Sequence, residues 1–184
     1  MNVRTASSTR LVTSEVMTPQ TVNAYGKVFG GYVFSKMDYA AFAAASRFAG
    51  APCVTASCDR VDFLTPIEVG ELVTFIAYVT YVGRSSVDVS VEVYAENVFT
   101  GERRHSNTGR FTMVAHKDGK TYEVPRLLCE TVEEQREYLE AKRRRELRDL
   151  HNKEKDRIAA EIDDLPDDVV TRLFREEGGI DSAS

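Results

Sequence analysis

The chain has 184 residues, of which 42% are hydrophobic, with 24 lysines and arginines against 29 aspartates and glutamates. This length predicts one domain with a sizeable core, and the composition is ordinary for a globular protein. Residues 1–125 are formally neutral, so residues 126–184 carry the whole net charge of −5. A neutral body with an acidic tail argues against a nucleic-acid partner, and no apolar run reaches the roughly 18 residues that a transmembrane helix needs.

The three cysteines give no sign of a metal site or of a disulfide framework. Cys53, Cys58 and Cys129 have none of the spacings of metal ligands, and an odd number cannot all pair. The N-terminus has no charged segment followed by an apolar one, as a secretion signal has. These features predict a cytoplasmic protein with reduced thiols and without a bound metal.

The pattern of apolar residues predicts one helix early in the chain. Residues 9–16 alternate between apolar and polar, which is typical of a strand, and residues 17–28 form a loop. From residue 31 to residue 49 apolar residues recur with a helical period, and Gly50 follows, where it can end the helix. The many alanines predict that this helix packs closely against a sheet.

Four further strands follow the helix, and short turns join most of them. The strands are predicted at Val54–Phe63, Glu71–Val82, Ser86–Val98 and Arg103–His116. Gly83 and Gly101 stand where hairpin turns are needed. Residues 1–125 therefore predict an α+β domain in which an antiparallel five-stranded sheet wraps one long central helix.

Residues 126–184 predict a charged helical C-terminal extension. Residues 131–160 contain neither glycine nor proline and are rich in Glu, Arg and Lys, which favours a solvated helix. A second short helix is expected at Asp167–Glu176, and residues 178–184 are expected to be disordered. The residues of the short helix that are expected to turn inward are Val170, Leu173 and Phe174.

The most informative stretch leads into the predicted central helix. Asn23 and Gly26 lie in the preceding loop, Gly30 and Gly31 stand where the helix begins, and Asp38 follows about two turns later. Without a Cβ, the paired glycines let a ligand approach the backbone, and free N–H groups at a helix start attract negative charge. Asp38 has no lysine or arginine one helical turn away. Each feature also has a purely structural explanation, namely a turn residue, a close-packing device and a surface carboxylate.

This stretch resembles the signature of the hotdog-fold acyl-CoA thioesterases, in the branch of the bacterial and brain acyl-CoA hydrolases. That signature has an Asn, a Gly three residues later, a Phe-Gly-Gly and an Asp in the second turn of the helix. Further matching segments, in the family's order, are Val54–Phe63, Tyr81–Ser86 and Thr100–Arg104, so the resemblance covers roughly residues 10 to 125. It implies a hotdog fold, hydrolysis of acyl-CoA to a free fatty acid and coenzyme A, and no cofactor.

The resemblance also implies roles for individual residues. Asn23 and Asp38 would form the active site from opposite subunits, with Gly31 at the helix start as the oxyanion hole and Gly30 against the substrate. Asp38 would act as general base or as nucleophile. The segment Arg84-Ser85-Ser86 would donate hydrogen bonds to the phosphates of coenzyme A, although it can also be a hairpin turn alone.

Members of this branch pair through the strand that follows the helix and commonly assemble as trimers of dimers. For this chain the resemblance implies a homo-oligomer, at least a dimer, in which Val54–Phe63 pairs with its symmetry mate. Two other functions stay open: an acyl-CoA-sensing module without catalysis, and a hotdog hydroxyacyl dehydratase. A dehydratase typically uses a histidine with a carboxylate, and no histidine lies near the central helix in the sequence.

Overall fold

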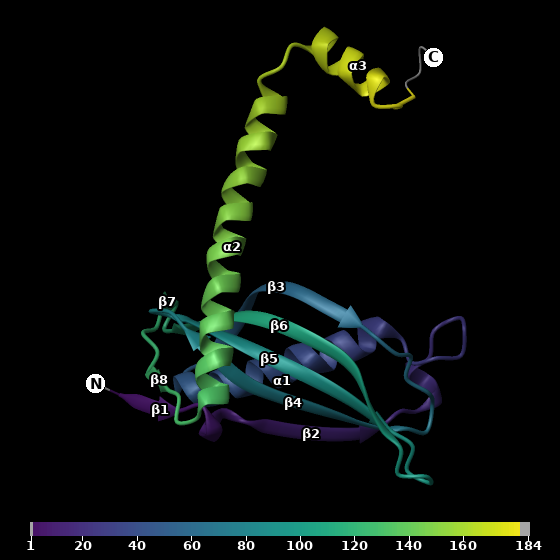
Figure 1. Ribbon diagram of the computed structural model, residues 1–184, viewed down its shortest axis with the longest axis vertical. Helices are drawn as coiled ribbons and strands as arrows, with labels where there is room; N and C mark the ends of the chain where they lie inside the picture. The colour runs from purple at the N-terminus through teal and green to yellow at the C-terminus, as the bar shows by residue number, and fades with distance from the viewer. Residues whose placement is uncertain (1, 181–184) are drawn as a thin grey trace. The chain divides into compact units, whose positions relative to one another are not determined.

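A curved sheet wraps one central helix, α1 (Gly30–Ala49), as Figure 1 shows for the computed structural model. The structure describes residues 2–180. The strands of the sheet are β2 (Leu11–Val16), β3 (Cys53–Phe63), β4 (Leu72–Val82), β5 (Ser86–Glu96), β6 (Arg103–Lys117) and the short β7 (Lys120–Thr121). Outside this sheet lie two short paired strands and two 3₁₀ helices, namely β1 (Val3–Thr5), β8 (Arg126–Leu128), η1 (Ser7–Thr9) and η2 (Pro19–Thr21).

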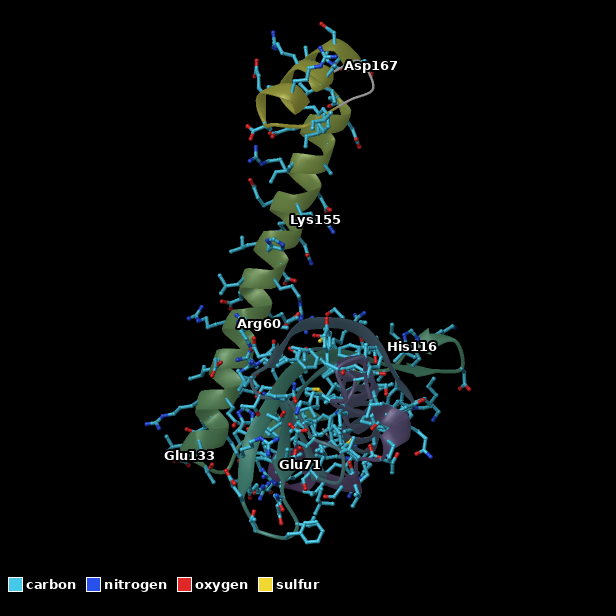
Figure 2. All side chains as sticks on the ribbon, turned by 90° about the vertical axis from the view of Figure 1, so that its right-hand side faces the viewer. Arg60, Glu71, His116, Glu133, Lys155 and Asp167 are labelled. Carbon is cyan, nitrogen blue, oxygen red and sulfur yellow. The ribbon has the colours of Figure 1, made fainter. Side chains whose placement is uncertain are left out.

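The main sheet has the order β2-β4-β5-β6-β3, and each of these neighbours pairs in antiparallel fashion. Viewed along the strands in Figure 2, the sheet curls around α1. The structure thus confirms the expected α+β architecture with its long helix and five principal strands. The two- and three-residue strands β1, β7 and β8 were not predicted, because so short a segment shows no hydrophobic period.

The core lies between α1 and the concave face of the sheet. β5 contributes a row of fully buried side chains, Val87, Val89, Val91 and Val93. α1 faces this row with alanines and with Met37, which is 0% exposed. A Cβ on Gly109 of β6 would collide with the Met37 methyl group, so the close approach of helix and sheet depends on a glycine at that point.

The first turns of α2 (Val132–Asp163) belong to the same compact unit as the sheet, which extends to Lys142. The Tyr138 ring contacts the Tyr81 ring with 5.0 Å between centroids. The Tyr78 hydroxyl lies 3.2 Å from a Glu137 carboxylate oxygen, and burial raises the pKa of that carboxyl. The division into domains at residue 125 stays a prediction; these contacts show what the first turns of α2 cover.

The second unit, from Arg143 onward, contains the rest of α2 and the helix α3 (Asp167–Glu176). Arg157 pairs with Glu154 and Glu161 along one helix face, in the manner of a solvated helix. The exposed fractions of Val170, Leu173 and Phe174 are 37%, 40% and 47%. The expectation that these three residues turn inward is therefore wrong, because no other described element of this unit covers them.

The bounds of both C-terminal helices lie within about three residues of those predicted. The expected disorder of residues 178–184 falls largely outside the described residues. Among the helices of residues 2–180, none combines the length and the apolarity that crossing a bilayer requires.

Candidate active site

Asn23 organises the loop that leads into α1. Its side-chain Oδ1 accepts hydrogen bonds from the backbone N–H groups of Tyr25 (2.9 Å) and Lys27 (3.2 Å). Its backbone N–H donates to the carbonyl of Lys27 (2.7 Å), and Gly26 takes a positive φ of 73° in the turn. The side-chain oxygen of Asn23 therefore has the structural role of a turn residue. Its side-chain N–H groups have no acceptor among the described residues, so Asn23 can still donate to a ligand.

The start of α1 presents two unbonded N–H groups. Phe29 precedes the helix in an extended conformation, and the N–H groups of Tyr32 and Val33 both bond to its carbonyl (3.0 and 3.2 Å). Within the described part of the chain, the N–H groups of Gly30 and Gly31 bond to no protein acceptor. Two free donors at the positive end of a 20-residue helix form a site for developing negative charge.

Asp38 lies on the side of α1 that faces β3. The Thr55 hydroxyl donates to Asp38 Oδ1 at 2.6 Å. No lysine or arginine among residues 2–180 forms an ion pair with this half-buried carboxylate. Burial raises the pKa of the neighbouring Cys58 thiol, and the charge of Asp38 adds to that effect. Thr55 could not be identified as a site residue from the sequence, because no sequence pattern indicates that it contacts a residue of the helix.

The β4–β5 hairpin carries the segment expected to bind phosphates. The Gly83 N–H donates to the carbonyl of Ser86 (2.9 Å) and closes the turn. Arg84 is exposed, Ser85 is half-buried and Ser86 is buried. The Arg84 guanidinium is therefore accessible to an anionic ligand, whereas the Ser86 side chain is largely shielded from solvent.

The predicted site residues do not lie together within one chain. Gly30 stands over Phe63, the last residue of β3, because a Cβ on Gly30 would lie 3.1 Å from that ring. Ser86 lies level with Val54 at the other end of the sheet, since both residues pair with Val114 of β6. At about 3.3 Å per residue, the two ends of β3 are roughly 25 Å apart once its bulges are allowed for. The donors at the start of α1 and the β4–β5 hairpin thus occupy opposite ends of the sheet.

A cavity of about 360 Å³ opens beside the start of α1. Asn23 and Gly30 line it. Its apolar wall is formed by Val28, Val33, Phe63, Leu64, Pro66 and Ile67. An apolar cavity next to hydrogen-bond donors suits a ligand with a polar head and an apolar tail. Histidine, cysteine, aspartate and glutamate form no group that could hold a metal ion within residues 2–180.

One long helix enclosed by a curled antiparallel sheet is the architecture of the hotdog class of proteins. The model of the Thioesterase superfamily matches residues 25–100. Protein VdlD of Helicobacter pylori is 37% identical over 146 residues, which cover 79% of this chain and 84% of VdlD. The uncharacterized acyl-CoA thioester hydrolase YkhA of Bacillus subtilis is 39% identical over 132 residues, covering 71% and 77%. The chain belongs to the thioesterase superfamily, among the hotdog-fold acyl-CoA hydrolases.

Solved structures agree with this assignment. The acyl-CoA hydrolase of Staphylococcus aureus, in complex with butyryl coenzyme A, coenzyme A and coenzyme A disulfide, has a TM-score of 0.79 at 32% identity, covering 87% of this chain and 98% of that one. Variants of that enzyme in which one aspartate, one asparagine or one threonine is replaced by alanine are also similar. An apo-hexameric acyl-CoA thioesterase has a TM-score of 0.80 at 34% identity, covering 83% and 98%.

Proposed function

We propose that this protein hydrolyses acyl-CoA to a free acid and coenzyme A. The observation that carries the proposal is the Asp38 carboxylate, which the Thr55 hydroxyl orients and which no described cation neutralises. Membership of the thioesterase superfamily and a similar structure with bound butyryl coenzyme A support the same chemistry. The proposed reaction needs water as its only co-substrate.

The helix start and the carboxylate divide the chemistry between them. The N–H of Gly31 and the side-chain N–H of Asn23 bind the thioester oxygen and stabilise the charge that develops on it. Asp38 removes a proton from water as the water oxygen attacks the carbonyl carbon. The C–S bond then breaks, and the coenzyme A thiolate takes up the proton that Asp38 removed from water, which restores the carboxylate. Direct attack by Asp38 would instead form an anhydride that water cleaves, and both routes need the same carboxylate.

The site is shared between two chains in this proposal. α1 rises about 10 Å between Gly31 and Asp38, too far for both to reach one carbonyl directly. β3 is an edge strand of the sheet, and apolar residues near it are exposed: Phe42, one helical turn after Asp38, is 43% exposed and Val54, next to Thr55 in β3, is 51% exposed. Antiparallel pairing of two β3 edges about a two-fold axis brings the α1 start of one chain toward the partner's Asp38 and Arg84.

Two features of similar structures support the choice of these residues and an oligomeric assembly. The asparagine, aspartate and threonine replaced in the Staphylococcus aureus enzyme have the same order and separations along that chain as Asn23, Asp38 and Thr55 have here. A similar acyl-CoA thioesterase is hexameric. We therefore propose a homo-oligomer of dimers, a trimer of dimers in its complete form, with Gly30 and the segment Arg84-Ser85-Ser86 contacting the coenzyme A portion.

A thiol-release assay with purified protein and a panel of straight-chain acyl-CoAs tests the function. The proposal predicts saturable release of free coenzyme A that depends on enzyme concentration. An Asp38→Asn preparation measured in parallel controls for contaminating hydrolases. Tight binding of acyl-CoA without thiol release would instead identify a sensing module. Hydration of an enoyl-CoA with the thioester intact would identify a dehydratase.

A further inference from the structure

Asn107 is a polar side chain buried in an apolar part of the fold. It lies on β6, is 1% exposed and lines the cavity beside the start of α1. The next positions on the same face of β6 are apolar or glycine, namely Gly109, Phe111, Met113 and Ala115. An aliphatic residue of similar size would also fill position 107, so packing alone does not explain an amide there.

The hydrogen bonds of Asn107 within the protein leave part of its amide unused. Its Oδ1 lies 2.7 Å from the Ser106 hydroxyl, and its Nδ2 lies 3.4 Å from the carbonyl oxygen of Asp62. A primary amide has two N–H donors and two acceptor positions. One N–H therefore has no acceptor among the described residues. A buried donor left without a partner costs about 1–3 kcal/mol, and an acceptor atom of a ligand in the cavity would recover that cost.

The other polar groups of the cavity lie nearer its opening. Asn23, Lys27 and Thr65 are half-buried, while Asn107 is buried. Gly30, at the start of α1, stands over Phe63, and Phe63 is the direct neighbour of Asn107 across β3 and β6. A thioester held at the start of α1 can therefore extend its acyl chain past Phe63 toward Asn107.

We propose that this cavity receives the acyl chain and that Asn107 recognises a hydroxyl or keto oxygen on it. The inference rests on the proposed thioesterase function and deepens it, by naming short oxygenated acyl-CoAs as the preferred substrate class. Asn107 is then a specificity-determining residue. A site built to hydrogen-bond a substrate oxygen rejects the analogue that lacks it, because the buried amide is left unpaired.

The test compares acyl-CoAs of equal length with and without one oxygen. Butanoyl- and hexanoyl-CoA are paired with their hydroxy and oxo derivatives, with the oxygen placed at successive carbons. At one of these positions the protein is expected to prefer the oxygenated substrate by about tenfold or more in kcat/KM. Asn107→Val should abolish this preference, chiefly by lowering kcat/KM for the oxygenated substrate.

Two controls keep the result interpretable. Thr112→Val removes another buried hydrogen-bonding side chain of β6, one that donates to Asp88, and should retain the preference. Asn107→Ser stays polar but is too short to reach the same oxygen, so it should lose the preference even if Asn107→Val does not fold. Calorimetric binding of thioether analogues gives the same comparison without turnover.

The outcomes separate this inference from the proposed function. Hydrolysis of plain acyl-CoAs with no oxygen preference at any position, or a preference that survives in both Asn107 variants, would overturn the role of Asn107 alone. A different result would be that the wild-type protein releases no thiol but still binds oxygenated analogues preferentially, while the Asn107 variants lose this preference. That result would overturn the thioesterase proposal and leave the recognition of an oxygenated acyl chain standing.

Discussion

The reactivity proposed for Asp38 depends on how its side chain is held. Its recorded side-chain partner is a neutral hydroxyl, and the bond from Thr55 is short at 2.6 Å. An arginine in that place would also orient the carboxylate, but its charge would lower the basicity of Asp38 and its capacity to attack. The hydroxyl fixes one oxygen and leaves the second for water or substrate.

Replacing Asp38 by Asn is predicted to reduce kcat by about 10²- to 10⁴-fold, because the amide cannot accept a proton from water. Thr55→Val should cost about 10- to 100-fold, since a hydrogen bond to a charged group contributes roughly 1.5–3 kcal/mol. Steady-state kinetics on both variants measure these effects. Asp118→Asn, in the β6–β7 turn, is the matched control and should have wild-type kinetics. A loss of less than fivefold in Asp38→Asn would make Asp38 a structural residue.

Among the secondary-structure elements, an ion pair attaches the loop between β3 and β4 to strand β6. Glu71 is 7% exposed and accepts two hydrogen bonds from the Arg104 guanidinium, at 2.6 and 2.7 Å. The same guanidinium donates to the carbonyl of Pro66, and Glu71 also accepts from the N–H of Glu68. This connection forms part of the wall of the cavity, so the pair holds the proposed acyl site in shape.

The pair predicts a loss of stability in acid. Hydrogen bonding to Arg104 lowers the pKa of Glu71 below its ordinary value. A group with a lowered folded-state pKa stabilises the protein above its unfolded pKa, and the contribution is lost as pH falls through the folded pKa. Glu71→Gln should therefore lower the free energy of unfolding by about 2 kcal/mol at neutral pH. The substitution leaves the Arg104 guanidinium, which is only partly exposed, without its charged partner.

Chemical denaturation at several pH values tests this prediction. The difference between wild type and Glu71→Gln should shrink as pH falls below about 4.5, where the unfolded carboxyl becomes protonated. Glu102→Gln, on the exposed β5–β6 turn, is the control. A difference between wild type and Glu71→Gln that is independent of pH would mean that lost packing, and not the charge, causes the destabilisation.

At the scale of the whole molecule, the two structural units predict different tolerance to truncation. Deleting residues 143–184 should leave the melting temperature and kcat/KM unchanged. Deleting residues 131–184 should still leave a folded, active body, but with a melting temperature a few degrees lower. The reason is the loss of the Tyr81–Tyr138 ring contact, worth about 0.5–1.5 kcal/mol. Calorimetry and thiol release on both truncations measure this; loss of cooperative unfolding in the shorter protein would show that α2 is essential to the core.

The fold of the body could be predicted from the sequence, because its long elements have clear periods. The alternation along β5 and the glycines in the turns on either side predict a strand from Ser86 to Val98. The observed strand begins at Ser86 and ends at Glu96, two residues earlier. The site could be predicted only in part. The bond between Thr55 and Asp38 joins residues 17 apart in the sequence. Asn107 differs from other asparagines only in that the fold buries it. Such contacts are created by folding and have no local sequence signal.

In the proposed dimer, each active site draws Asn23 from one chain and Asp38 from its partner. The most direct measurement mixes inactive Asn23→Ala protein with inactive Asp38→Ala protein after both have been dissociated. A mixed dimer then has one site with both substitutions and one site with neither. Random pairing makes about half of the dimers mixed, so the account predicts recovery of about a quarter of the wild-type activity. Confirmed subunit exchange by mass spectrometry with no recovered thiol release would contradict the claim and place both residues in a site within one chain.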